Sequence, residues 1–289
     1  MTGPQGTQPR NGVVLFTSDR GIRPADLAKA AEERGFDTIY VPEHTHIPVR
    51  RDALHPTGGK DLPDDRYLRT LDPWVSLATC AQVTSRIGLS TAVALPVESD
   101  PITLAKSIAT LDFLSGGRVS IGVGFGWNTD ELADHGIPGD RKRTALAEYL
   151  GALRSLWTEE EASYDGEFVS FGPSWAYPKP VQDHIKIVVG AGGGPKTMKW
   201  IAQNADGWMT TPRETDIGDR AALLRKEWAD AGRQGEPEVR ILVAKRPEPE
   251  DLADWERAQA AEMIWGVPDA EPDVVLPYLD KLAGRLGLS

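Results

Sequence analysis

Short apolar runs and amphipathic stretches alternate along almost the whole chain. Apolar, β-branched runs of this kind predict buried strands, and stretches with a 3.6-residue repeat predict helices. The first strand is expected at residues 12–18, and a helix over 23–35 follows, with Pro24 near its start and Gly35 at its end. Seven further strands are expected at residues 37–43, 87–96, 118–128, 185–192, 206–211, 238–244 and 262–267. Helices are expected between them, over or near residues 71–85, 100–117, 143–160, 194–205, 217–232, 250–261 and 271–287.

Eight strand–helix units without a break in composition predict a parallel sheet that closes into a (β/α)8 TIM barrel. We therefore expect one barrel domain over residues 12–289, preceded by a flexible tail over residues 1–11. Two long insertion loops stand out, residues 44–70 and 159–184, and the second contains a candidate hairpin at 161–173. In such barrels the chemistry takes place at the carboxyl ends of the strands, so the residues there are the candidates.

The fourth predicted strand carries glycine at every second position: Gly122, Gly124 and Gly126. A dinucleotide fingerprint of the form G-x-G-x-x-G would need glycine at position 127, which is Trp127, so that motif is excluded. Side chains alternate between the two faces of a strand, so one face here is bare. The pattern indicates either tight packing inside the barrel or close approach of a ligand.

Composition narrows the class of protein. The chain of 289 residues has a net charge of −11 and a pI near 5.0, which argues against a nucleic-acid or anionic membrane surface. Its only cysteine, Cys80, excludes an internal disulfide and fits the reducing cytoplasm; it lies in an apolar helical stretch and is interpreted as core. No apolar run reaches the roughly 18 residues of a membrane span, and the first residues lack the apolar segment of a signal peptide.

Two strand ends carry candidate chemistry. "GAGGGPKT" at residues 190–197 places glycines before a helix that Pro195 opens, which predicts an anion site at the helix N-terminus or, alternatively, a tight turn. "VPEHTHIP" at residues 41–48 offers His44 for proton transfer beside Glu43. No further ligand accompanies these two residues and His46, so no metal is expected. Arg213, after the sixth strand, is either an anion ligand or a solvated loop charge.

Several stretches resemble the luciferase-like flavin and deazaflavin oxidoreductases, and within them the branch that uses coenzyme F420. The resemblance rests on residues 21–48, 111–128, 171–182, 190–197 and 204–208. It implies a (β/α)8 barrel and a bound deazaflavin, with FMN as the alternative cofactor. It also implies a small-molecule substrate and, as in most of the family, a homodimer.

The resemblance assigns roles to particular residues. Thr91–Ala92 aligns with a non-prolyl cis peptide behind the cofactor ring, Glu43 contacts the cofactor, and His44 lies at its reacting face. A phosphate-binding segment aligns with Gly192, Gly193, Gly194, Pro195 and Lys196, and Arg213 lies near a basic phosphate-binding position.

One departure concerns the substrate. The sugar-phosphate dehydrogenase of the superfamily carries a glutamate just after the fourth strand, where this chain has Trp127. We therefore expect an apolar or planar substrate, lined by Phe16, Trp127 and Asn128. The rivals are an FMN monooxygenase, a phosphosugar isomerase or lyase, and a cofactor-binding protein without catalysis. The isomerase would need a Schiff-base lysine or paired carboxylates at the strand ends, and no convincing set is found.

Overall fold

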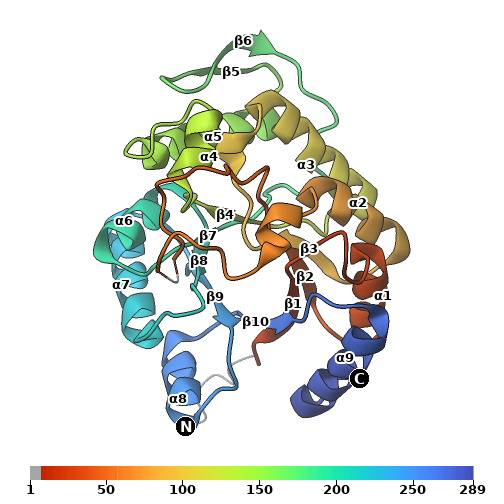
Figure 1. The fold of residues 1–289 in the computed structure, drawn as a ribbon. Coiled ribbons are helices and arrows are strands. Elements are labelled where there is room, and N and C mark those ends of the chain that lie inside the picture. Colours follow the sequence, from red (N-terminus) through yellow and green to blue (C-terminus); the bar gives the residue numbers. More distant parts are fainter. Residues whose placement is uncertain (1–7, 57, 289) are drawn as a thin grey trace.

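The computed structural model describes residues 8–56 and 58–288. Its centre is an eight-stranded sheet in the order β3-β2-β1-β10-β9-β8-β7-β4 (Figure 1). Neighbouring strands pair in parallel, and the bridges Leu89–Val119 and Ala94–Val123 bring β3 and β4 together. The strands thus form a nearly closed barrel, which confirms the predicted (β/α)8 fold. They are β1 (Arg10–Leu15), β2 (Thr38–Val41), β3 (Gly88–Thr91), β4 (Ile121–Gly124), β7 (Ile187–Gly190), β8 (Gly207–Met209), β9 (Glu238–Val243) and β10 (Glu262–Val267).

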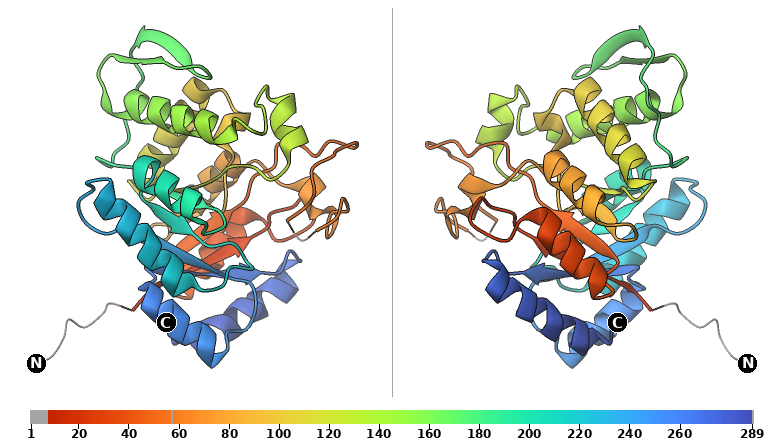
Figure 2. Two further views of the ribbon diagram at one scale, coloured as in Figure 1. Left: turned by 90° about the vertical axis from the view of Figure 1, so that its left-hand side faces the viewer. Right: turned by 90° about the vertical axis from the view of Figure 1, so that its right-hand side faces the viewer.

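Helices surround the sheet on its outer side (Figures 1 and 2). They are α1 (Pro24–Glu33), α2 (Pro73–Val83), α3 (Pro101–Ser115), α4 (Thr129–Asp134), α5 (Lys142–Thr158), α6 (Pro195–Asn204), α7 (Ile217–Asp230), α8 (Pro249–Ala258) and α9 (Pro272–Leu286), with 3₁₀ helices η1 (Asp65–Arg69) and η2 (Pro96–Glu98). Many start on proline, whose missing N–H costs nothing in the first turn. Asp72 and Asp100 cap α2 and α3 through their side chains. None of the described helices is long and apolar enough to cross a bilayer.

The predicted hairpin is present. It consists of β5 (Ala162–Asp165) and β6 (Ser170–Ser174), which pair antiparallel outside the barrel and next to α5 (Figure 1). The other long loop, residues 44–70, contains η1 and belongs to the end of the barrel where the strands finish. The two insertions therefore lie at different places on the barrel. Only the loop 44–70, which begins at His44, is close to the candidate chemistry.

The bare face of β4 serves packing inside the barrel. A Cβ on Gly122 would lie 2.1 Å from the Thr91 carbonyl oxygen, and one on Gly124 would lie 2.6 Å from a methyl group of Val93. A Cβ on Gly190, in β7, would lie 2.4 Å from the other methyl group of Val93. Of the two interpretations of these glycines, the structure supports close packing, because Val93 and the Thr91 backbone fill the space.

The first strand starts earlier than expected. The predicted tail ended at residue 11, whereas β1 begins at Arg10. Asn11 is tied down because its N–H donates to the Asp37 carboxylate over 2.7 Å and its side-chain oxygen accepts from Trp265. Arg10 lies 2.7 Å from Glu238. These partners come from distant parts of the chain, so the local sequence could not reveal them. Residues 1–7 of the predicted tail lie outside the described residues.

Candidate functional site

Five aromatic rings gather where the strands end. Phe16 follows β1, His44 follows β2, Trp127 follows β4, and His55 and Tyr67 belong to the loop 44–70. Tyr67 is central, with ring centroids 4.7 Å from Phe16, 5.6 Å from His44 and 5.1 Å from His55. Trp127 closes the group at 5.7 Å from His44 and 5.0 Å from His55. The cluster encloses the His44 side chain, which is 7% exposed.

His44 forms a buried pair with Glu131. Its Nδ1 lies 2.9 Å from the Glu131 carboxylate, which is completely buried and projects from α4. The indole N–H of Trp127 donates to the other ring nitrogen, Nε2, over 3.4 Å. Nε2 therefore carries the lone pair and Nδ1 the proton, which it donates to Glu131. In this tautomer Nε2 is the atom that can accept a proton from a substrate, once the Trp127 indole N–H that donates to it moves aside.

The Glu131 carboxylate is also held in place. It accepts hydrogen bonds from the Thr45 backbone N–H over 3.1 Å and from the Asn128 side-chain amide over 3.3 Å. With His44, three donors converge on one carboxylate and fix its position. The orientation of the imidazole ring therefore depends on Glu131, and not on the neighbouring Glu43.

Glu43 lies behind the site. It is 7% exposed, and its carboxylate accepts the Leu95 backbone N–H over 2.6 Å. No contact between Glu43 and His44 is found in the described structure. Burial raises the pKa of Glu43 to about 7, and the nearby charges of Asp72 and Glu131 act in the same direction. Glu43 is thus a titrating group beside the site, as expected for a functional carboxyl.

This raised pKa predicts a pH-dependent stability change on Glu43→Gln. The folded protein disfavours ionised Glu43, so wild-type stability falls as the pH rises from the ordinary carboxyl pKa, 4.5, to about 7. Glutamine keeps the acceptor for Leu95 and does not ionise. We expect the variant to match wild type near pH 4.5 and to exceed it by about 1–3 kcal/mol at pH 8, measured by chemical denaturation. Equal stabilities at both pH values would contradict the burial of this carboxyl.

The other predicted pocket residues occupy different environments. Phe16 is half-buried against Tyr67, with the Arg66 guanidinium 5.3 Å from its ring centre. Asn128 is buried and turned toward Glu131, and its Oδ1 has no hydrogen-bond partner. The structure also corrects the position of Trp127. Because β4 ends at Gly124, Phe125 follows the strand directly, and the acid on this side of the barrel is supplied by Glu131.

The non-prolyl cis peptide lies one residue later than expected. It joins Ala92 to Val93, and not Thr91 to Ala92. Thr91 still pairs with Val41 in the parallel register of β3, and its hydroxyl donates to the Gly122 carbonyl oxygen over 2.7 Å. The Thr91 side chain is therefore engaged within the barrel wall, and β3 ends at Thr91, one residue before the cis peptide bond begins.

The glycine-rich turn combines packing with an open backbone. A Cβ on Gly193 would come within 2.9 Å of the Trp208 ring, so this glycine is required by packing. A Cβ on Gly194 would meet nothing within 4 Å, and Gly192 is exposed with Glu214 as its nearest neighbour at 3.8 Å. Pro195 begins α6, and the Lys196 side chain is exposed. The tight-turn interpretation therefore applies to Gly193. The open backbone at Gly192 and Gly194, before the start of α6, is what the anion-site interpretation requires.

A cation of the basic run "RKR" at residues 141–143, which the sequence predicts as either a basic cluster or a helix opening, lies beside this helix start. Arg143, in the first turn of α5, donates to the Thr197 hydroxyl over 3.0 Å. Its guanidinium lies 4.3 Å from the centre of the Phe125 ring, and its Nη1 is buried without a hydrogen-bond partner. Burial lowers the pKa of Arg143. An under-satisfied cation at a helix N-terminus is suited to an anion.

Arg213 is close enough to the ring cluster for its charge to act on His55. It is exposed on the loop after β8, and its charge acts on His55, whose pKa is lowered mainly by burial. Within the described ranges, no group of three or more His, Cys, Asp or Glu side chains is arranged to hold a metal ion.

Sequence reasoning missed Glu131, Glu98, His55 and Tyr67. Glu131 lies three residues after Asn128 in "WNTDELADHG", where the glycine and proline that follow predict no helix, whereas the structure has the short helix α4. An acid one helical turn beyond a strand-end residue was the available signal, because residues three and four apart share a helix face. His55 and Tyr67 lie in the long loop, whose path only the folded chain determines.

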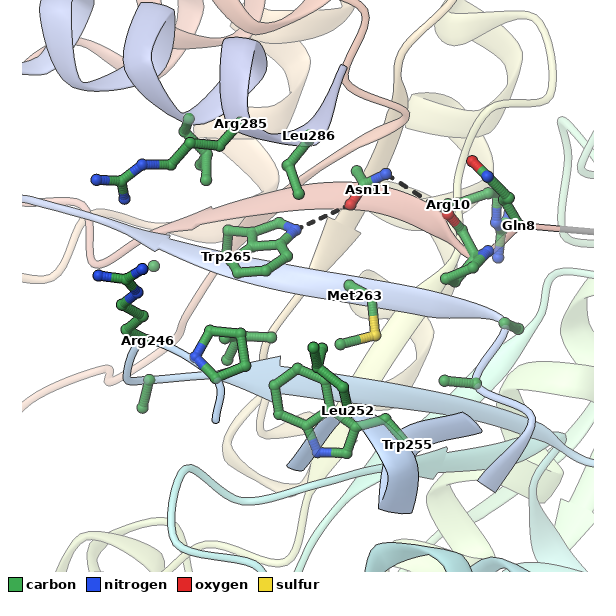
Figure 3. Close-up of a pocket in the computed structure, with 18 of the residues that line it drawn as sticks. Gln8, Arg10, Asn11, Arg246, Leu252, Trp255, Met263, Trp265, Arg285 and Leu286 are labelled. Carbon is green, nitrogen blue, oxygen red and sulfur yellow. Dashed lines mark hydrogen bonds between the residues drawn. The ribbon is translucent and has the colours of Figure 1, made fainter. Parts of the chain in front are cut away.

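A large groove of the described chain lies away from this site. A groove of about 1590 Å³ lies on the outer side of the barrel, between α8 and α9 and over β10 (Figure 3). Trp255, Met263, Trp265 and Leu286 supply apolar surface, and Arg246 and Arg285 extend toward one end of it (Figure 3). Its lining includes Lys245 and Arg246 after β9 but no residue of the aromatic cluster, so the candidate chemistry is assigned to the His44 region.

A comparison with family models matches residues 10–284 to the luciferase-like monooxygenase family. The chain belongs to this family. The uncharacterized protein Rv0953c of Mycobacterium tuberculosis is 63% identical over 276 residues, which cover 95% of this chain and 98% of that protein. The present chain is also 32% identical over 190 residues to an F420-dependent glucose-6-phosphate dehydrogenase of Nakamurella multipartita. This match covers 65% of the present chain and 51% of the dehydrogenase.

Solved structures agree with the family fold. A crystal form of an F420-dependent secondary alcohol dehydrogenase, in complex with an F420-acetone adduct, superposes with a TM-score of 0.74 at 17% identity. The match covers 96% of this chain and 98% of the dehydrogenase. At this identity the similarity establishes the luciferase-like barrel, while cofactor and substrate must be argued from the residues.

Proposed function

We propose that this protein transfers a hydride between coenzyme F420 and a small organic substrate, with His44 as the proton donor or acceptor. The observation that carries the proposal is the buried His44–Glu131 pair at the carboxyl ends of the barrel strands. The names of the F420-dependent relatives support the choice of cofactor. When bound, the deazaflavin supplies the C5 carbon that accepts or gives the hydride.

The chain has polar groups that fit such a cofactor. Three side-chain atoms near the strand ends are buried without a hydrogen-bond partner: Thr17 Oγ1 after β1, Asn128 Oδ1 after β4 and Arg143 Nη1 beside α6. Unsatisfied buried polar atoms cost about 1–3 kcal/mol each, so a ligand that pairs with them gains affinity. We assign the phosphate to Arg143 and the start of α6, with Gly192, Gly194 and Lys196 beside it.

His44 has a defined task in this reaction. For an alcohol substrate, loss of a hydride from carbon yields a carbonyl only if the hydroxyl proton also leaves. Nε2 accepts this proton, since Nδ1 already donates to Glu131, and the resulting imidazolium is stabilised by the carboxylate. In the reverse direction Nε2 returns the proton. Phe16 and Trp127 supply aromatic surface for an apolar or planar substrate.

The deciding experiment is a titration of the purified protein with coenzyme F420 and, separately, with FMN. We expect quenching of deazaflavin fluorescence with saturable binding and weaker or no binding of FMN. Selective FMN binding would replace the proposal with the monooxygenase alternative. Binding of neither would overturn it, and tight F420 binding without turnover on a broad panel of alcohols and carbonyl compounds would favour a non-catalytic carrier.

Arg143→Ala tests the phosphate assignment. Losing a charge-assisted contact costs about 1.5–3 kcal/mol, so the Kd for F420 should rise roughly 10- to 100-fold. Arg141→Ala is the matched control, because Arg141 is exposed and pairs with Glu167 over 2.5 Å. An unchanged Kd for Arg143→Ala, measured by the same fluorescence titration, would place the phosphate elsewhere.

A further inference from the structure

A line of hydrogen-bonded side chains leads from His44 to the surface. Glu131, the partner of His44, lies beside a second buried carboxyl, Glu98. The Thr45 hydroxyl donates to Glu98 Oε2 over 3.1 Å. The same hydroxyl oxygen lies 2.9 Å from His135 Nε2. Thr45 therefore connects the two ends, because its backbone N–H donates to Glu131 over 3.1 Å and its hydroxyl contacts both Glu98 and His135 at the surface.

The outer end of the line is open to water. Besides His135, the Thr45 hydroxyl contacts His46 Nδ1 at 3.0 Å. His46 Nε2 in turn lies 3.0 Å from the Asp134 carboxylate, and the two side chains are 41% and 61% exposed. His135 is exposed as well, and burial of its ring, followed by the charge of His46, lowers its pKa. A neutral imidazole can both accept and release a proton near pH 7.

The inner end of the line carries a proton. Burial raises the pKa of Glu98 to about 9, and the charges of Glu131 and Glu43 add to the effect. Glu98 is therefore protonated at neutral pH. Its Oε1 is buried and no donor reaches it. Thr45 ties Glu98 to Glu131, because its hydroxyl donates to Glu98 Oε2 and its backbone N–H donates to Glu131 Oε1, and the nearby charge of Glu131 favours the protonated form of Glu98.

The enclosed position of His44 creates the need for such a path. Trp127, Tyr67 and His55 surround the ring, and the Nε2 side is where a substrate would be. A proton taken up at Nε2 cannot return by the same side while the product is bound. The opposite nitrogen, Nδ1, faces only Glu131 among the groups that can accept a proton.

We infer that Glu131, Glu98 and Thr45 form a proton relay that connects His44 with His46 and His135 at the surface. This inference rests on the proposed function, because it concerns the proton that His44 handles. Each group passes one proton and receives one. For a proton to leave, the Thr45 hydroxyl turns from Glu98 to His46 or His135 and gives up its proton, which passes on to water, and the Thr45 oxygen then takes the proton of Glu98 at Oε2. Glu98 in turn takes a proton from Glu131, and Glu131 takes the Nδ1 proton of His44. The reverse sequence reloads His44.

The test compares Thr45→Val, which removes the hydroxyl at nearly constant volume, with Thr45→Ser, which keeps it. The readout is the exchange rate of the His44 Nδ1 proton with water, followed by NMR of the full chain labelled with ¹⁵N-histidine. The signal is assigned by its loss in His44→Ala. We expect exchange to slow at least tenfold in Thr45→Val and to recover in Thr45→Ser. Thr110→Val, an exposed threonine on α3, controls for the substitution itself.

Glu98→Gln gives an independent variant. Glutamine has the charge of protonated Glu98 and can still accept from Thr45 and donate to Glu131, but it cannot pass a proton on. We expect the same slowing, and with F420 and substrate present a larger solvent isotope effect on turnover that added imidazole reduces. Exchange at the wild-type rate in both Thr45→Val and Glu98→Gln would overturn the relay. Absence of F420 turnover in wild type would instead remove the proposed function, while the exchange rates would still decide the relay.

Discussion

Replacing His44 with alanine is expected to lower the turnover number about 10²- to 10⁴-fold, the range that one general acid or base contributes. The reason is that Nε2 of this ring is the atom that takes or gives the substrate proton, while the cofactor is held by other groups. The Kd for F420 should change little. Turnover is measured by F420 absorbance, and the Kd by fluorescence titration.

His184→Ala is the matched control for this prediction. His184 is exposed, lies just before β7 at the opposite end of the barrel and pairs with Asp206 over 2.8 Å. It should leave both turnover and F420 affinity unchanged. If His44→Ala retained wild-type turnover, His44 would not be the proton donor or acceptor. If it lost F420 binding instead, the ring would be a cofactor ligand.

Glu131→Gln is expected to lower turnover by a similar factor, about 10²- to 10⁴-fold. The carboxylate accepts from His44, Thr45 and Asn128 at once, and an amide cannot accept from all three. When the amide nitrogen faces Nδ1, the imidazole must hold its proton on Nε2, the wrong tautomer for accepting one. The imidazolium also loses its counter-charge.

A double variant separates this positioning role from an independent one. If Glu131 acts through His44, His44→Ala/Glu131→Gln should be no slower than His44→Ala alone, since residues that work as a unit are not additive. Multiplied losses would show that Glu131 acts on its own. Thermal unfolding of each variant, with the folded baseline intact at the assay temperature, checks that the loss is not one of structure.

Much of the architecture follows from local patterns. Runs such as residues 185–192 are apolar and β-branched because both faces of a parallel strand are buried, and prolines such as Pro24, Pro101 and Pro195 mark helix starts. The ends of strands and helices cannot be predicted from local patterns where contacts with distant parts of the chain decide them. Arg10 and Asn11 join β1 only because Glu238, Asp37 and Trp265 lie beside them.

The buried charges inside the barrel show the same limit. Arg240, 2% exposed, donates to Glu238 over 2.9 Å and to the Tyr40 hydroxyl over 3.1 Å. Burial alone would raise the pKa of Glu238, yet the charges of Arg240 and Lys186 hold it at about 2. In the sequence Glu238 and Arg240 are two charged residues within an otherwise apolar strand, and nothing local shows that they pair in the interior.

The sequence by itself determined the fold class, the family resemblance and the strand-end position of His44, because each depends on patterns within short segments. Only the tertiary structure decided which groups act on His44. Glu131 and Glu98 follow different strands, and Thr45 and Tyr67 lie in a loop whose course the barrel sets. The role of the β4 glycines was open in the sequence for the same reason. Whether a bare strand face receives a ligand or a neighbour depends on what lies opposite, and here that neighbour is Val93.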